Sequence, residues 1–193
     1  MRTMTPALSL LASGLLALGT STVAFGDSDR DDDDRRRSRP GVAPVTNATY
    51  REECGACHMA YQPNLLPARA WDDIMSLEAL ANHYGDDASL GNGTRTEIRN
   101  YLTNHAADEA GRFRSPALAR ASRSPAHAPE EALPRISATR YFRHEHDEIP
   151  DRLVSGNPEV MSLSQCNACH RGAEQGIYNE HQVDIPGAGR WDD

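Results

Sequence analysis

The sequence predicts a mostly α-helical fold of short helices and loops, with little or no β-structure. Apolar residues recur at helical spacing in several short segments, and no two segments show the apolar and polar alternation typical of paired strands. Hydrophobic residues make up only 38% of the 193 residues, with three Phe and two Trp, a small supply for an ordinary core. The motif CxxCH also occurs twice. We therefore expect the helices to pack around an apolar group that the polypeptide does not itself contain.

Residues 1–26 have the features of a secretory signal peptide. Arg2 precedes an apolar run over residues 7–18, and small residues then lead to a cleavage site at residues 24–26. A membrane anchor is the alternative, but serine and glycine interrupt the run and no basic flank follows it directly. We expect export to the periplasm, cleavage, and no membrane insertion of the mature chain.

Residues 27–48 are predicted to form a disordered tether. Six Asp and five Arg crowd residues 27–39, and two prolines follow. Such a segment has too little apolar surface to offset the entropy lost on ordering. An acidic docking or metal-binding tail is the alternative interpretation.

The folded domain is expected over residues 49–186, and its first half, residues 49–111, is expected to hold three helices. The first helix begins near Thr49 and ends before a proline. The second covers residues 68–85 and is closed by Gly85. Its apolar stripe follows helical spacing and consists of Ala70, Ile74, Leu77, Ala81 and Tyr84.

The third helix is predicted to begin at Thr94, in a T-R-T-E capping box completed by Glu97, and to end at Gly111. Residues 112–134 contain four prolines and little periodicity, so we expect a surface connection between the two halves of the domain. One face of the third helix carries Ile98, Tyr101, Leu102 and His105.

The second half of the domain, residues 135–186, is expected to hold two short helices. Ser137 is predicted to cap the first, with Ile136 and Tyr141 forming a hydrophobic staple. The second carries the second CxxCH motif, and residues 187–193 form a tail. One face of the first helix is expected to present Phe142, His146 and Ile149.

Each CxxCH motif places two thiols and an imidazole on one face of a helical turn. This is the attachment pattern of haem c, in which both thiols bond to the porphyrin and the histidine reaches the iron. We therefore predict two haem c groups, which would supply the missing apolar surface, with His58 and His170 as proximal ligands. The thioether cysteines are Cys54, Cys57, Cys166 and Cys169.

Other uses of paired cysteines fit less well. Zinc knuckles usually lie about 12 to 20 residues apart, whereas 108 residues lie between Cys57 and Cys166. A thioredoxin-like redox pair needs a βαβ context that this sequence lacks. Disulfides are plausible in a secreted chain but do not explain a histidine directly after each pair.

The sixth ligand of each iron decides the function, because an open site can bind a small molecule and a filled site can only pass electrons. His83 lies about 140° around its predicted helix from the apolar stripe, so it is not simply a core side chain. It follows His58 by 25 residues, and a chain reversal over residues 59–67 could bring it over the same haem. His146 precedes His170 by 24 residues, so it is the comparable candidate for the second haem. An ordinary packed or solvated histidine is the alternative for both candidates.

Other side chains could also fill a sixth position. His105 lies on an apolar helix face and is the reserve ligand. Met59 is too close to His58 to cross a haem, while Met75 and Met161 are formal thioether candidates. The remaining histidines are expected at the surface: His127, His144 and His181.

The text around both motifs, HMAYQPNLLPARAW after the first and ACHRGAEQG at the second, resembles the bacterial dihaem cytochrome c family over residues 49–186. The resemblance implies a periplasmic electron carrier with two low-spin, bis-histidine haems and no enzyme activity. It implies as redox partners a small oxygen-binding monohaem cytochrome and a membrane b-type cytochrome. The economical assignment pairs His83 with the first haem and His146 with the second, and a crossed assignment stays open. The positions that match the family's ligands are His58, His83, His146 and His170.

The net charge of −8 bears on the partners. An acidic protein is unsuited to nucleic acid, and cationic patches on other proteins are its natural electrostatic partners. Two alternatives to the carrier remain: a small dihaem oxidoreductase or peroxidase with one open haem site, and a dihaem subunit of a periplasmic nitrate reductase.

Overall fold

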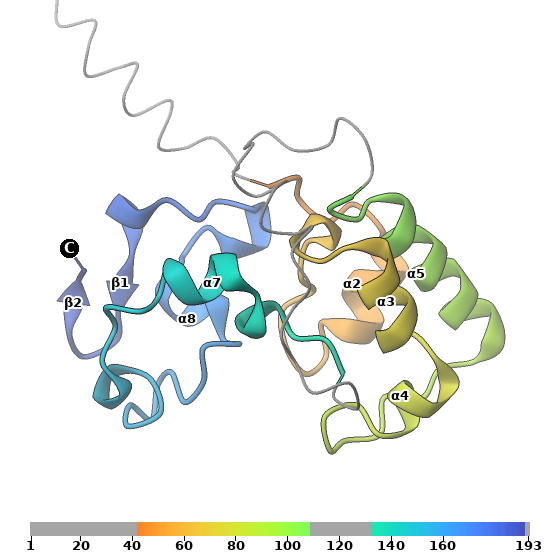
Figure 1. Ribbon diagram of the computed structural model, residues 1–193, viewed down its shortest axis with the longest axis horizontal. Coiled ribbons are helices and arrows are strands. Elements are labelled where there is room, and N and C mark those ends of the chain that lie inside the picture. Colours follow the sequence, from red (N-terminus) through yellow and green to blue (C-terminus); the bar gives the residue numbers. More distant parts are fainter. Residues whose placement is uncertain (1–41, 109–132, 192–193) are drawn as a thin grey trace, which may run out of the picture.

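The computed structural model describes residues 42–108 and 133–191, and this part of the chain is mostly helical with one small sheet (Figure 1). In Figure 1, helices α2 to α5 gather on one side and α7, α8 and both strands on the other. The predicted mostly helical fold is confirmed. The predicted signal peptide, most of the tether and nearly all of the proline-rich connection lie outside the described residues.

Helix α2 (Ala48–Cys54) begins where Asn47 caps it, the Asn47 side chain accepting a hydrogen bond from the Tyr50 amide at 2.6 Å. The helix ends at Cys54, although the sequence predicted that it would continue through the first CxxCH motif. The rest of that motif is a turn. A Cβ on Gly55 would lie 2.1 Å from the Arg51 carbonyl oxygen, so the turn requires glycine at this position.

The predicted single helix over residues 68–85 is two helices, α3 (Ala68–Ile74) and α4 (Leu77–Ala81). The break occurs because Ser76 adopts an extended backbone and its hydroxyl accepts a hydrogen bond from the Ala79 amide at 3.2 Å, which starts a new helix. The predicted apolar stripe therefore does not continue past the break: the Leu77 side chain is 60% exposed.

Helix α5 (Asn92–Asn104) begins two residues before the predicted start at Thr94 and ends well before Gly111. The predicted capping box is wrong, because the Glu97 carboxylate instead accepts a hydrogen bond from the Asn47 side chain at 3.1 Å. Its Ile98 and Leu102 are among the most deeply buried residues, at 0% and 1% exposure.

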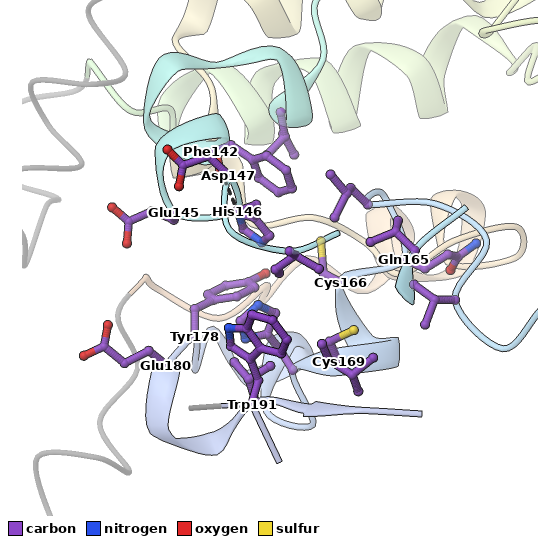
Figure 2. Close-up of a pocket in the computed structure, with 18 of the residues that line it drawn as sticks. Phe142, Glu145, His146, Asp147, Gln165, Cys166, Cys169, Tyr178, Glu180 and Trp191 are labelled. Atoms are coloured by element: carbon purple, nitrogen blue, oxygen red, sulfur yellow. Dashed lines mark hydrogen bonds between the residues drawn. The ribbon is translucent and has the colours of Figure 1, made fainter. Parts of the chain in front are cut away.

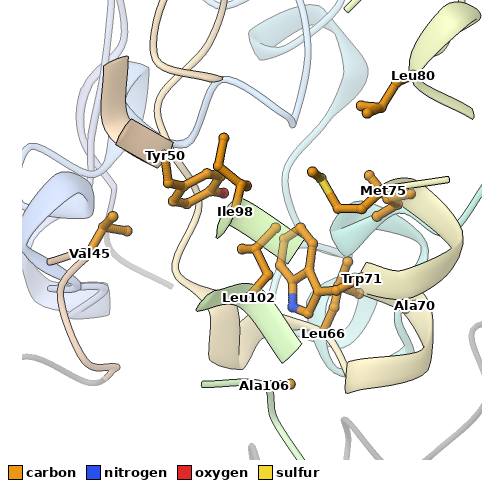
Figure 3. Packing of buried hydrophobic residues seen from close by; sticks show 11 residues of the cluster. Val45, Tyr50, Leu66, Ala70, Trp71, Met75, Leu80, Ile98, Leu102 and Ala106 are labelled. Carbon is orange, nitrogen blue, oxygen red and sulfur yellow. The ribbon is translucent and has the colours of Figure 1, made fainter. Parts of the chain in front are cut away.

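The core of the first half lies between α2, α3 and α5 (Figure 3). Trp71 packs at its centre and donates its indole hydrogen to the Pro63 carbonyl oxygen. Burying side chains of this size stabilises the fold by about 1.5 to 3 kcal/mol each. The first half thus has an apolar core of its own, which consists of Val45, Tyr50, Leu66, Ala70, Trp71, Ile74, Met75, Leu80, Ile98, Leu102 and Ala106.

The second half contains two short helices, α7 (Arg140–His144) and α8 (Cys166–Cys169). The cap of α7 is Thr139, which accepts a hydrogen bond from the Phe142 amide at 3.2 Å, and not the predicted Ser137. With Thr139 as the cap, Ile136 is not the residue directly before it, as the expected staple requires, but lies in a 3-10 turn. Both His146 and Ile149 lie beyond the end of α7, so they do not continue its face.

Two strands, β1 (Asp184–Ile185) and β2 (Gly189–Arg190), pair antiparallel. The sequence indicated no strand pair, and a pair of two-residue strands is too short to show alternation. The described residues also include 3-10 turns, at Pro63–Leu65, Ile136–Ala138, Asp151–Leu153, Ala173–Gln175 and Glu180–Gln182.

The start of the described chain packs against both halves, with Val45 in the apolar core of the first half and Val42 against the second. Val42 and Val45 fall within the predicted tether, yet they are 3% and 9% exposed. The Val42 amide donates to the Gly176 carbonyl oxygen at 3.2 Å. Gly176 has φ +76°, and a Cβ there would lie 2.3 Å from the Val42 carbonyl oxygen. Both the turn and the close approach of the chain therefore require glycine.

Candidate functional site

The first centre contains the first CxxCH motif. The Nδ1 of His58 donates a hydrogen bond to the Met59 carbonyl oxygen at 2.7 Å. The imidazole also stacks on the Tyr61 ring, with centroids 4.7 Å apart and planes 17° apart. Because a carbonyl only accepts hydrogen bonds, Nδ1 carries the hydrogen and Nε2 keeps a free lone pair, as a metal ligand requires.

A second histidine faces His58 across this centre. The ring centroids of His58 and His83 are 6.4 Å apart, with planes 21° apart. The sequence predicted His83 on a helix, but it lies in the turn after α4, where its backbone pairs with that of Asp86. Its Nδ1 is buried without a hydrogen-bond partner, and burial, with His58 nearby, lowers the pKa of His83. A neutral imidazole with an unpaired polar atom suits a metal ligand.

The second centre repeats this arrangement with different ring angles. The centroids of His146 and His170 are 6.1 Å apart and their planes are 69° apart. The Nδ1 of His146 donates to the Phe142 carbonyl oxygen at 2.7 Å, so its Nε2 is also free (Figure 2). Burial, followed by the effect of His146, lowers the pKa of His170 to about 4, which keeps this imidazole neutral near pH 7.

A cavity of about 520 Å³ surrounds the second centre (Figure 2). His146, His170 and both cysteines of the second motif line it. Carboxylates at its edge include Glu145 and Glu180, whose side chains are exposed. A cavity of this size with apolar walls suits a flat, largely apolar group. Those walls include Leu153, Val154, Val160, Leu163 and Val183.

The residues at both centres fit covalently attached haem. A metal–imidazole bond is about 2 Å long and the ligating nitrogen lies roughly 1 Å from its ring centre, so two imidazoles on one metal have centres roughly 6 Å apart. Both histidine pairs match that separation. Burial raises the pKa of the Cys54 and Cys166 thiols to about 11.

The other candidate ligands lie elsewhere. His105 ends α5, where its Nδ1 donates to the Tyr101 carbonyl oxygen at 2.8 Å and its ring contacts the Tyr101 ring. Within residues 42–108 and 133–191, no ring contact joins it to His58 or His170. The Met75 side chain is part of the apolar core of the first half.

Residues that sequence reasoning missed join the two centres. The Tyr61 hydroxyl donates to the Ser164 carbonyl oxygen at 2.8 Å. The Gln62 side chain is fully buried, donates to the Ala173 carbonyl oxygen at 2.6 Å and accepts from the Tyr178 hydroxyl at 2.6 Å. The ring of Tyr178 in turn contacts His170. The only signal in the sequence was the position of Tyr61 and Gln62 directly after the first motif.

A mostly helical chain with two CxxCH motifs, each facing a second histidine, is a c-type cytochrome with two haems. The family model described as dihaem cytochrome c matches residues 50–178. That match covers more than half of the chain, which therefore belongs to the dihaem cytochrome c family and carries two c-type haems with iron.

Solved structures show the same relationship. A diheme cytochrome c from Shewanella baltica OS155 is 43% identical and covers 76% of this chain and 98% of its own, with a TM-score of 0.61. A diheme cytochrome c from Rhodobacter sphaeroides is 40% identical and covers 71% of this chain and 100% of its own, with a TM-score of 0.57. No curated protein matches the sequence. Within the described residues, no helix is long and apolar enough to span a membrane.

Proposed function

We propose that this protein carries single electrons through two haems whose irons are each held by two histidines. The observation that supports this most directly is the opposed pair at each centre: His83 faces His58, and His146 faces His170, at 6.4 and 6.1 Å between ring centroids. This is the economical pairing of the sequence analysis. A crossed pairing has no support from the ring contacts among the described residues.

A bis-histidine site suits a carrier and not an enzyme. The bound iron would supply a one-electron couple, at a lower potential than histidine and methionine ligation would give. His83 and His146 would fill the positions that a substrate needs. The hydrogen bonds and aromatic stacking that orient His58 and His146 keep these ligands in place, so little reorganisation accompanies a change of charge.

The location and partners belong to the same proposal. The signal-like residues 1–26 support export to the periplasm, where c-type haem would be attached and the chain would act. The resemblance to the family supports a small oxygen-binding monohaem cytochrome as the electron acceptor. It also supports a membrane b-type cytochrome as another protein of the same electron-transfer pathway. The net charge of −8 supports docking to cationic surfaces, which higher ionic strength would weaken.

Carbon monoxide provides the test of the ligand assignment. We expect two irons per chain, both low-spin, and no change in the optical spectrum when carbon monoxide is added to the reduced protein. The variants His83→Ala and His146→Ala should each open one site to carbon monoxide. Binding by the unmodified protein would instead support the catalytic alternative with one open haem.

A further inference from the structure

The two histidine pairs differ in one respect that their sequences do not reveal, the angle between the two ring planes. In the first centre the planes of His58 and His83 are 21° apart, close to parallel. In the second centre the planes of His146 and His170 are 69° apart, closer to perpendicular. The separations of the ring centroids are almost the same, so the angle is the main difference between the two ligand pairs.

Aromatic side chains account for the orientation of the rings. At the second centre the Phe142 ring lies flat on the His146 ring, with centroids 3.9 Å apart and planes 6° apart. The carbonyl oxygen of Phe142 also accepts a hydrogen bond from the His146 Nδ1 at 2.7 Å. Figure 2 shows Phe142 next to His146 in the cavity wall. Two contacts from a single residue thus restrict rotation of the imidazole about both of its side-chain torsions.

Phe142 is itself fixed in place. Its side chain is only 9% exposed. Its amide donates to the Thr139 hydroxyl, and that hydroxyl donates to the Ile136 carbonyl oxygen at 2.9 Å. The first centre has a matching arrangement, in which Tyr61 stacks on His58. Each centre therefore has an aromatic ring stacked on one imidazole, which restricts the plane of that imidazole.

The ring angle matters because an imidazole interacts with the iron d orbitals through its π system, which is perpendicular to the ring. Two parallel rings act on the same d orbital and separate the two orbitals of π symmetry in energy. Two perpendicular rings act on different orbitals and leave these two nearly equal in energy. In oxidised low-spin iron, the first case gives a rhombic electron paramagnetic resonance spectrum, and the second a spectrum dominated by one feature at low field.

Building on the proposed bis-histidine ligation, we infer that Phe142 is a positioning residue that holds His146 across His170, and that the two haem centres are therefore magnetically distinct. The centre of His58 and His83 gives the rhombic signal. The centre of His146 and His170 gives the low-field signal. Phe142 acts only through His146.

The experiment is electron paramagnetic resonance of the frozen, oxidised, haem-loaded protein and of matched variants, each with iron counted per chain. The unmodified protein should show one rhombic and one low-field signal in equal amounts. Phe142→Leu removes the flat face and should move the low-field signal while the rhombic signal stays. Phe142→Tyr keeps the flat face and should leave both signals unchanged. Tyr61→Leu is the reciprocal control, compared with Tyr61→Phe, which loses only the hydrogen bond to Ser164; the difference between these two variants should fall on the rhombic signal alone.

The outcomes separate this inference from the proposed function. Two low-spin signals of the same type in the unmodified protein, or no shift in Phe142→Leu, would overturn the inference and leave the bis-histidine carrier intact. A high-spin signal in the unmodified protein would overturn the carrier itself. Loss of the second iron from both Phe142→Leu and Phe142→Met would also overturn the inference, because Phe142 would then be needed for haem retention and not for ring orientation.

Discussion

Removing the Gln62 side chain should destabilise the protein strongly, because this amide joins the two haem-binding halves. The side chain is fully buried, donates to the Ala173 carbonyl oxygen and accepts from the Tyr178 hydroxyl. Both hydrogen bonds are 2.6 Å long, which is short for neutral groups. In the sequence these partners lie more than 100 residues from Gln62.

The magnitude follows from what Gln62→Ala would leave behind. Each hydrogen bond contributes about 1 kcal/mol net, and a buried partner left without one costs about 1 to 3 kcal/mol. The Ala173 carbonyl oxygen keeps the Gly176 amide as a donor at 2.9 Å, so it loses only the net contribution of one hydrogen bond, whereas the hydroxyl of the half-buried Tyr178 loses Gln62 as its acceptor. We therefore expect the free energy of unfolding to fall by about 2 to 4 kcal/mol.

The assay is urea unfolding of the haem-loaded protein, followed by far-ultraviolet circular dichroism. With a slope of about 2 kcal/mol per M, the midpoint should fall by about 1 to 2 M without a change of slope. The control Gln182→Ala alters an exposed glutamine and should change the stability by less than about 0.5 kcal/mol. Tyr178→Phe removes only one of the two hydrogen bonds but leaves the buried Gln62 oxygen without this donor, so it should cost about 1 to 3 kcal/mol. A fall of less than about 0.5 kcal/mol in the free energy of unfolding of Gln62→Ala would refute the reasoning, since removing a buried, hydrogen-bonded amide should destabilise the protein more than that.

Two further predictions concern a glycine and the reserve ligand. Gly176→Ala should destabilise the protein by about 1 to 3 kcal/mol in thermal unfolding, because the residue has φ +76° and its new Cβ would meet Val42. Gly93→Ala is the control, because no atom from outside α5 lies within 4 Å of the position of its Cβ. The same measurement should show that the free energy of unfolding rises by roughly 0.5 to 1 kcal/mol. Equal effects at both glycines would contradict the close packing at Gly176. His105→Ala should leave the optical and electron paramagnetic resonance spectra of both haems unchanged, because His105 contacts Tyr101 and not a proximal histidine; a new high-spin signal would make it a ligand.

Sequence reasoning was most successful where the chemistry is local. Cys54, Cys57 and His58 lie within five residues of one another, so two thiols and one imidazole come together whatever the rest of the chain does. The thin supply of hydrophobic residues also indicated a large apolar group. The family match and the related solved structures agree with the prediction of two haem c groups.

Helix boundaries were less predictable, because polar side chains near an element can end it. Ser76 starts a new helix where apolar spacing alone predicted continuity. Thr139 takes the cap expected of Ser137, and Glu97 bonds to Asn47 in place of its own helix. In each case a side-chain oxygen accepts a hydrogen bond from one of several N–H groups near it, and tertiary packing decides which donor it takes.

The sequence by itself determined the class of protein and the number of haems and predicted the proximal ligands, because each depends on residues within five positions of one another. It also singled out His83 and His146, but not what would bring them near His58 and His170. Only the tertiary structure decided the two opposed pairs, their different ring angles and the amide that joins the halves. Each of these requires a chain reversal or a contact across a long stretch of sequence, and such contacts depend on the packing of the whole chain and not on local spacing.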